Sequence, residues 1–338
     1  MAPPPPAPTP PGLIPPGLAR ISVVVPVYGG WEYVHRLLTD LQAVPAIAEI
    51  VVVDDAHPEP PPADIEQWHR AVRYHRRSTN GGFAAAVNTG VEHAHHEVVL
   101  VLNADLCVDP TMVAGLHERV VAEPEAIHGP QIDSGEGPQV DQQRPFPTQR
   151  SLLLEFLVPL RLAPALDRRL RGLDHQPATE PVDVDWLSGA CLGFTRATFA
   201  TIGPLDERFG MYVEDAEWQH RAHRLGVARR YHPDLVVRHD IGHGAFRDQA
   251  RVDERYLAAW AASLTLLDMR GAPMWLVRAL LGLGAIVNTP FVLARQLGAR
   301  LGRIRRGPSL AAYWRVPRLP TRAPVHRGAN QAAPGVED

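Results

Sequence analysis

The sequence contains no lysine, so all 34 of its basic residues are arginine. Its two cysteines, Cys107 and Cys191, are too few for a disulfide framework or a cysteine-rich zinc site. They fit a reducing compartment, in which thiols stay free. Met1 precedes a proline-rich run instead of a basic region and an apolar stretch, so we expect no secretory signal.

The net charge of −3 is unevenly distributed. The segment Arg270–Asp338 holds 11 arginines and two acids, a net charge of +9, whereas the preceding 269 residues hold 23 arginines and 35 acids, a net charge of −12. Such asymmetry predicts that the basic rear of the chain meets an anionic partner. Nucleic acid and a lipid headgroup surface are both candidates at this point.

Composition divides the chain into four parts. Residues 1–19 include nine prolines and are interpreted as a disordered or polyproline-like leader, and residues 317–338, rich in Pro, Gly and Ala, as a disordered tail. Residues 20–269 are expected to form one α/β domain, and residues 270–316 a helical region. No internal repeat is apparent.

Apolar, β-branched runs alternate with helical patterns in the first half of the α/β domain. The expected strands are 21–28, 50–54, 72–75 and 98–103, and the expected helices are 31–43, 82–94 and a segment after Pro110. Strands buried on both faces and separated by helices predict a largely parallel, doubly wound sheet. In the second half we expect a strand or two over 182–194, a short strand at 236–240, and helices at 214–225, 255–269 and 273–301.

Ligands of doubly wound sheets bind beyond the carboxyl ends of the strands, and polar residues gather there. Asp54-Asp55 ends one apolar strand, and Asn103-Ala-Asp105 follows another. Oxygen ligands at a strand end suit Mg²⁺ or Mn²⁺, which bind one or two carboxylates and complete their shell with substrate phosphates. A turn or cap explains each pair equally well when it is taken alone.

Three further motifs have similar alternatives. The segment Asn80–Gly90 opens a helix with paired glycines, which favours a bound anion but fits neither the Walker nor the dinucleotide-binding pattern. Glu214-Asp215 could supply a general base or simply favour a helix start through the helix dipole. His239, one of 16 histidines, could be structural or a metal ligand.

The ordered set of motifs resembles the family 2 glycosyltransferases of the GT-A fold, particularly their bacterial rhamnosyltransferase-like branch, over about residues 21–245. A nucleotide-diphospho-sugar transferase fold with a mixed, doubly wound sheet and a C-terminal helical extension is therefore expected. The matching segments are Val23-Val-Val-Pro-Val-Tyr28, Val51-Val-Val-Asp-Asp55, Asn80-Gly-Gly-Phe83 with Asn88-x-Gly90, Leu102-Asn-Ala-Asp105, Trp186-Leu-Ser-Gly-Ala190, Gly203-Pro-Leu-Asp-Glu-Arg-Phe209 and Tyr212-Val-Glu-Asp215.

The resemblance implies roles on the donor side. Nucleotide and donor contacts fall to Pro26, Tyr28, Asp55 (toward the base), Asn80, Gly81 and Asn103. Asp105, the last acid of a D-x-D-type motif, would coordinate Mg²⁺ or Mn²⁺, with His239 as a further ligand. The first position of that motif is Asn103 here, where the pattern has Asp.

On the acceptor side, the resemblance implies that Asp215 is the catalytic base and that Trp186, Gly189, Ala190 and Glu214 lie near the acceptor. A single base opposite the leaving nucleoside diphosphate implies one displacement and inversion at the anomeric carbon. The resemblance favours dTDP-rhamnose as donor, with UDP- and GDP-sugars next, and a cell-envelope glycan or polyprenyl-diphosphate-linked acceptor. A sugar-1-phosphate nucleotidyltransferase and a non-catalytic sugar-binding scaffold remain as alternatives.

The apolar segment near the C-terminus suggests where in the cell the protein is located. Residues 279–294 form an apolar stretch of 16 that contains Asn288 and Pro290, short of the ~20 residues that a spanning helix needs. Arginines flank it on both sides, which favours a helix lying in an anionic membrane interface, on the cytoplasmic face of the cell membrane. A helix packed on the catalytic domain is the alternative. Nucleic-acid binding is not expected.

Overall fold

The computed structural model describes residues 19–133, 145–157, 178–239, 249–300 and 307–321. Its strands form one mixed sheet in the order β3-β2-β1-β4-β8-β6-β9-β5, with β7 paired to β9. Their bounds are β1 Ile21–Val27, β2 Ile47–Asp54, β3 Val72–Arg76, β4 Val98–Leu102, β5 Leu106–Cys107, β6 Ile127–Asp133, β7 Val182–Asp183, β8 Cys191–Thr195 and β9 Arg229–His239.

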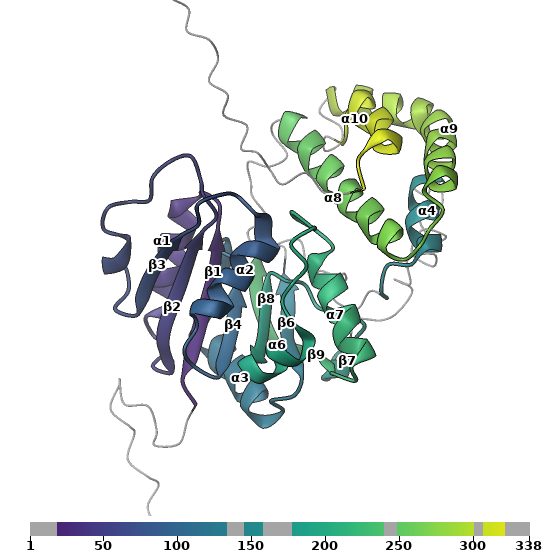
Figure 1. Ribbon diagram of the computed structural model, residues 1–338. Coiled ribbons are helices and arrows are strands. Elements are labelled where there is room, and N and C mark those ends of the chain that lie inside the picture. Colours follow the sequence, from purple (N-terminus) through teal and green to yellow (C-terminus); the bar gives the residue numbers. More distant parts are fainter. Residues whose placement is uncertain (1–18, 134–144, 158–177, 240–248, 301–306, 322–338) are drawn as a thin grey trace, which may run out of the picture.

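Helices cover the sheet and then form a separate group at the C-terminal end (Figure 1). Those associated with the sheet are α1 Trp31–Leu41, α2 Gly82–His93, α3 Pro110–Ala122, α6 Arg196–Ile202 and α7 Glu214–Arg224, with a 3₁₀ turn, η1, at Ile65–Gln67. The C-terminal group comprises α4 Gln149–Leu157, α8 Gln249–Met269, α9 Met274–Arg300, α10 Leu310–Arg315 and the 3₁₀ turn η4 at Val316–Arg318.

The first half follows the pattern that the sequence predicts. Strands β3, β2, β1 and β4 are parallel neighbours, and β1 lies between β2 and β4. The chain therefore winds outward from β1 to β3, and α2 carries it back to β4 on the other side of β1. This reversal makes the carboxyl ends of β1 and β4 the switch point at which such sheets bind ligands.

Two strands interrupted by proline were missed or shortened by the sequence analysis. β6 contains Pro130, and β9 contains Pro233, although only residues 236–240 of β9 were expected. The two strands pair in parallel, and their register shifts between Pro130 and Gln131, so that His232 and Val236 face successive residues of β6. Proline cannot donate to a ladder and is accommodated at such a bulge.

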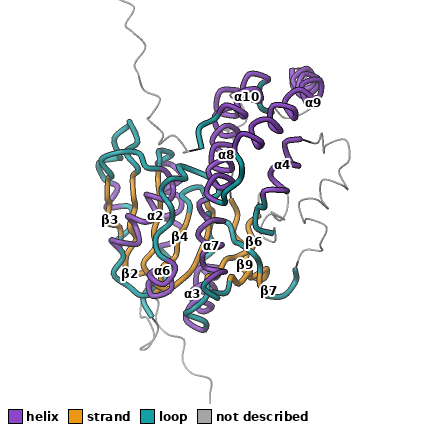
Figure 2. The backbone as a smooth tube through the Cα atoms, turned by 45° about the vertical axis from the view of Figure 1, so that its right-hand side comes forward, coloured by secondary structure: helices purple, strands orange, loops and turns teal. Residues whose placement is uncertain are grey.

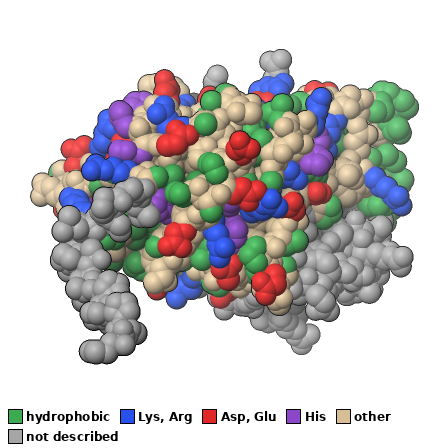
Figure 3. Space-filling view, turned by 90° about the horizontal axis from the view of Figure 1, so that it is seen from below, with side chains coloured by type: hydrophobic (Ala, Val, Ile, Leu, Met, Phe, Trp, Pro, Cys, Tyr) green, Lys and Arg blue, Asp and Glu red, His purple; other side chains and the backbone are tan. Residues whose placement is uncertain are grey.

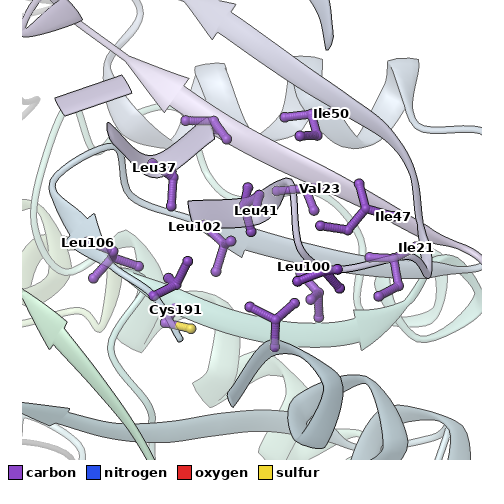
Figure 4. Close-up of a cluster of buried hydrophobic side chains, with 14 of the residues drawn as sticks. Ile21, Val23, Leu37, Leu41, Ile47, Ile50, Leu100, Leu102, Leu106 and Cys191 are labelled. Atoms are coloured by element: carbon purple, nitrogen blue, oxygen red, sulfur yellow. The ribbon is translucent and has the colours of Figure 1, made fainter. Parts of the chain in front are cut away.

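Both faces of the sheet are packed with apolar side chains. One cluster joins the strands to α1 and α3, and Figure 4 shows its members from β1, β2, β4 and α1 interdigitating around Leu41 and Leu100. A second cluster joins the other face to α2 and α7, with Trp218 and Phe194 in contact at its centre. The continuous apolar runs of the strands follow from burial on both faces.

The C-terminal helices have a core of their own. Phe156 of α4 packs against Trp260 of α8 and Tyr313 of α10, and the cluster extends to Leu281 and Ala285 of α9. Figures 1 and 2 show this group standing beside the sheet, at the edge of α7. The disordered tail was expected to begin at Pro317, but Pro317 lies in η4, and Arg278 donates to the carbonyls of Pro317 and Leu319.

α9 is longer than its most apolar part. The helix is continuous over 27 residues, and Met274–Ala299 has the length and apolar composition of a membrane-spanning helix. Counting only the 16 residues of 279–294 therefore underestimated it. One face, which includes Val277, Leu281 and Ala285, is buried among the C-terminal helices. Another exposes large apolar side chains, namely Trp275, Leu276, Leu283, Ile286, Val287, Phe291, Leu293 and Leu297.

Candidate active site

The two carboxylates that end β2 are both buried, and they make different contacts. Asp54 accepts hydrogen bonds from the Tyr74 hydroxyl (2.6 Å), Arg76 (2.5 Å) and the backbone amide of His57 (2.8 Å). It fixes the loop that leaves β2 to the neighbouring strand β3. The alternative that one member of the pair is structural therefore describes Asp54.

Asp55 holds the start of α2. Its carboxylate accepts from the backbone amides of Gly81 (3.0 Å) and Gly82 (2.6 Å) and lies 2.9 Å from Nε of Arg77. Burial raises the pKa of this carboxyl, while the glycine amides and Arg77 act in the opposite direction. Asp55, predicted to contact the nucleotide base, thus joins the end of β2 to the Asn80-Gly-Gly motif, in which the Asn80 side chain accepts from Gly82 (3.0 Å).

The glycines of this motif permit a close approach to the segment that precedes α7. Gly82 has a φ of +82°, and a Cβ atom there would lie 1.7 Å from the carbonyl oxygen of Gly210. The Phe83 amide donates to that same oxygen (3.0 Å). No other residue fits at position 82. The predicted donor loop therefore lies directly against the backbone of the segment that precedes α7.

Gly189 and Ala190 link the predicted metal motif to the predicted base. The Asn103 amide donates to the carbonyl of Ala190 (2.9 Å), and the Gly189 amide donates to Oδ2 of Asp215 (2.9 Å). A Cβ on Gly189 would lie 3.1 Å from the Phe83 ring and 3.2 Å from Cβ of Asp215. Segments near residues 83, 103, 189 and 215 therefore converge at one place, beyond the carboxyl end of β4.

Asp105 and His239 meet across the β5–β9 pair. His239 Nε2 lies 3.0 Å from Asp105 Oδ1, and Leu106 pairs with His239 in the sheet. Close by in sequence, Oδ1 of Asn103 is buried and has no hydrogen-bond partner. No group of three or more His, Cys, Asp or Glu side chains that could hold a metal is found among the described residues. One carboxylate, one imidazole and a free amide oxygen still suit an ion that takes further ligands from a diphosphate.

The acids at the start of α7 differ in their surroundings. Glu214 is buried, and its Oε2 has no hydrogen-bond partner. Burial, with a contribution from the charge of Asp215, raises the pKa of Glu214 well above its usual value. Asp215 is half-buried and accepts from Gly189 and from the Ala216 amide (2.8 Å). Burial therefore disfavours the charged form of Glu214 beside the half-buried Asp215.

Unusual backbone conformations flank these acids. Among the described residues, the non-glycine residues with positive φ are Ala56 (+59°), Tyr212 (+74°) and Val213 (+71°). Ala56 directly follows Asp55, and Tyr212-Val213 directly precede Glu214-Asp215. A β-branched residue in this region is an outlier that costs about 1–3 kcal/mol, and such strain concentrates at functional sites.

Other predicted residues lie around this centre. Pro26 is half-buried in β1, and the Tyr28 ring at the end of that strand is 48% exposed, with its edge against His57 (5.0 Å between centroids). Trp186 is half-buried, and its indole donates to the Pro145 carbonyl (3.4 Å). Asn88 binds the backbone of Leu205 through both ends of its amide, so its role is structural.

Sequence reasoning missed Gln219. Its buried amide accepts from the backbone amide of Leu187 (2.7 Å) and donates to the carbonyls of Leu187 (2.7 Å) and Asp215 (3.2 Å). It thereby fixes the 186–190 segment to α7. Its position, four residues after Asp215 and thus one helical turn away, was the signal in the sequence.

Residues 22–166 match the model described as Glycosyl transferase family 2. The likeness to family 2 glycosyltransferases is therefore shown for this segment of the chain. The expected resemblance is thus confirmed over residues 22–166, which include the motifs around Asp55, Asn80 and Asp105.

Two curated relatives are distant in sequence. A low-salt glycan biosynthesis hexosyltransferase of Haloferax volcanii is 27% identical over 213 residues, which cover 61% of this chain and 62% of that protein. The N-acetylglucosaminyl-diphospho-decaprenol L-rhamnosyltransferase of Mycobacterium tuberculosis is 26% identical over 244 residues, 68% of this chain and 79% of that protein. This chain thus spans less than two thirds of the archaeal relative.

The fold has solved counterparts. The crystal structure of GalNAc-T7 with UDP, GalNAc and Mn²⁺ superposes with a TM-score of 0.52 at 22% identity, over 66% of this chain and 44% of that one. At this identity the likeness concerns the fold, which is the GT-A architecture expected from the sequence.

Proposed function

We propose that the protein is an inverting glycosyltransferase that moves a sugar from a nucleotide-sugar donor to an acceptor hydroxyl. The observation that carries this proposal is the pair of backbone contacts through Gly189 and Ala190, which join Asp215 to Asn103. A carboxylate and a diphosphate-binding motif held this closely are the two parts that a single displacement needs.

Asp215 is the general base in this mechanism. It removes the proton of the acceptor hydroxyl as that oxygen attacks the anomeric carbon, and the sugar–phosphate bond breaks on the opposite side. Burial raises the pKa of Glu214 and so disfavours a second negative charge beside the base. The Gly189 amide orients the carboxylate, and a positioned base contributes ~10²–10⁴-fold to the rate.

Asp105 and His239 would hold Mg²⁺ or Mn²⁺, with Asn103 beside them. When bound, such an ion neutralises the charge that grows on the leaving diphosphate. The Mn²⁺ in the structure of GalNAc-T7 supports this assignment. Tyr28, Asn80 and Gly81 lie on the donor side, with Tyr28 offering an exposed ring to the nucleotide base.

We propose dTDP-rhamnose as donor and a cell-envelope or polyprenyl-diphosphate-linked glycan as acceptor. The names of the two curated relatives support a glycan product, and the mycobacterial name a decaprenyl-linked acceptor. A cavity of about 440 Å³ lies between Gly210-Met211 and α8. Leu257 and Ala261 line it from α8, and Leu319 lines it from the end of the described chain. It offers the acceptor a route from the side of the C-terminal helices.

We also propose that α9 lies along the cytoplasmic face of an anionic membrane. Its exposed apolar face supports this placement, and Figure 3 shows hydrophobic side chains gathered at the end of the molecule where Figure 1 draws the C-terminal helices. Its opposite face is packed, and Asn288 donates to the Phe156 carbonyl (3.0 Å). A helix that crossed the membrane would draw these neighbours into lipid, so we favour the interface.

Two substitutions test the proposed reaction. Asp215→Asn is expected to fold and bind donor normally but to transfer sugar at least ~10²-fold more slowly. Asp105→Ala is expected to abolish the Mn²⁺-dependent part of nucleoside diphosphate affinity in calorimetry. Asp64→Asn, at an exposed carboxylate on the β2–β3 connection, is the control. Wild-type turnover by Asp215→Asn would disprove the assignment of the base.

A further inference from the structure

The strained turn at Tyr212-Val213, which precedes Asp215, is in contact with the C-terminal helices. Arg255 of α8 donates from Nε to the hydroxyl of Tyr212 (3.0 Å). Tyr212 and Val213 also pack against the apolar core of the C-terminal helices. Their left-handed φ angles of +74° and +71° are not intrinsic preferences of a tyrosine and a valine. Surrounding contacts must therefore impose them.

The turn decides where Asp215 points. Val213 is the N-cap of α7, so the direction in which the helix leaves the turn depends on its left-handed conformation. Asp215 follows two residues later and reaches the Gly189 amide at 2.9 Å. On the other side of the turn, Gly210 is fixed by its contact with Gly82 and Phe83. Tyr212 is thus the point at which a contact from α8 acts on this segment.

We propose that Arg255 is a positioning residue for the transfer reaction, which acts through the Tyr212 hydroxyl to hold the 212–213 turn and thereby the Asp215 carboxylate. This inference rests on the proposed role of Asp215. It makes the C-terminal helices a part of the active site, and not only a means of placing the enzyme. Arg255 touches neither donor nor acceptor in this mechanism, so its loss affects the chemical step and leaves donor binding unchanged.

Steady-state kinetics of single variants test whether Arg255 and the Tyr212 hydroxyl act on the chemical step. Arg255→Ala and Tyr212→Phe are expected to lower kcat at least tenfold while the KM for the donor stays within twofold of wild type. Tyr212→Phe removes only the hydroxyl and keeps the ring in the apolar core, so it serves if Arg255→Ala does not fold. Arg119→Ala, which removes an arginine of a surface ion pair with Asp234, is the control.

A second substitution separates positioning from simple loss of structure. Glycine adopts left-handed φ without steric cost, so Val213→Gly lets the turn form without the hydrogen bond from Arg255. In the Arg255→Ala background it is expected to restore kcat to within threefold of wild type. A wild-type kcat in Arg255→Ala and Tyr212→Phe would overturn the inference, and so would a loss that Val213→Gly does not rescue.

The same experiments separate this inference from the proposed function. If Asp215→Asn is inactive while Arg255→Ala is fully active, the assignment of Asp215 as the base is supported and the positioning role of Arg255 is disproved. If Asp215→Asn remains active, the proposed base fails first. Combining Arg255→Ala with Asp215→Asn is expected to give no further loss beyond Asp215→Asn alone, because Arg255 acts through that carboxylate. Additive losses would count against it.

Discussion

Two adjacent carboxylates occur twice in this site, and each time the members of the pair have different tasks. Asp54 anchors a loop and Asp55 caps a helix motif, while Glu214 is buried without a partner for Oε2 and Asp215 faces Gly189. Sequence alone locates such pairs but cannot divide the roles, because these depend on residues distant in the chain, such as Arg76 and Gly189.

At the residue scale, the raised pKa of Glu214 predicts a pH-dependent effect of Glu214→Gln. The unfolded chain releases this proton near the usual carboxyl pKa of 4.5, whereas the folded protein retains it to higher pH. Folding above pH 4.5 therefore includes proton uptake, which lowers the stability of the wild type as pH rises. Glutamine mimics the neutral acid, so the variant is expected to gain stability over wild type as pH rises above 4.5.

Thermal unfolding of both proteins from pH 4 to pH 8 measures this difference. The two melting temperatures are expected to converge near pH 4 and to separate with rising pH. A difference that does not change with pH would mean that Glu214 is ionised in the folded protein. Transfer activity of Glu214→Gln is expected to fall far less than that of Asp215→Asn, because Asp215 and not Glu214 is the proposed base.

At the element scale, β6 and β9 show where periodicity fails as a guide. Pro130 and Pro233 argue locally against strands, yet both are accommodated where the register shifts. The resulting long parallel pair brings His128 and His232 together inside the protein. Their rings stack at 5.3 Å, and His128 Nε2 donates to the Glu123 carbonyl (2.9 Å).

This histidine pair predicts a loss of stability in mild acid. Burial lowers the pKa of both side chains, that of His232 to about 4. Below pH 6.5 these histidines bind protons in the unfolded chain but not in the folded protein. Stability is therefore lost as pH falls from about 6.5 toward 4, by up to about 1.4 kcal/mol per pH unit for each such proton.

His232→Gln is expected to reduce this dependence. His232 Nε2 lies 3.0 Å from His128 Nδ1, and a glutamine amide can replace that contact without titrating. The slope of stability against pH between 6.5 and 4.5 should therefore become shallower. Urea unfolding at several pH values measures it, and His35→Gln, which removes an exposed imidazole from α1, is the control. An unchanged slope in His232→Gln would mean that other groups govern the acid transition.

At the scale of the whole molecule, the sequence predicts the sheet and the long helices α8 and α9, but not how the C-terminal helices pack. The motifs around residues 55, 81, 103 and 215 could be located because they follow buried strands or open helices, and the sheet topology brings most of them together. The contacts of Gly82 with Gly210 and of Arg255 with Tyr212 could not be predicted, because they depend on how α8 packs beside α7. α4 was missed for the same reason, since its partner α9 lies far along the chain.

That packing also changes what removal of the C-terminal helices should do. Trp260, Leu264 and Leu267 of α8 are buried with Leu281 and Ala285 of α9. Deleting residues 271–338 would expose this apolar core, so we expect an aggregating protein and not a soluble, active domain. Arg278 is likewise engaged by Pro317 and Leu319, and is not available to lipid headgroups.

Membrane association is better tested on the exposed face of α9. Ile286 is 60% exposed, so Ile286→Glu should fold normally while placing a charge in the apolar surface that would meet lipid. Its binding to vesicles containing anionic lipid is expected to fall at least tenfold. The control is Val121→Glu, which makes the same kind of change at a 44% exposed position of α3, far from α9 in Figure 1.

The lipid and salt dependence of wild-type binding distinguishes an interfacial helix from a spanning one. Arginines near an anionic surface contribute about 1 kcal/mol each, and salt screens that attraction. Co-sedimentation should therefore require anionic lipid and weaken at high ionic strength. Retention in the pellet after a high-salt wash would indicate insertion, which the length of Met274–Ala299 permits. No binding by wild type, or equal binding by Ile286→Glu, would contradict the proposal that the exposed face of α9 meets a membrane.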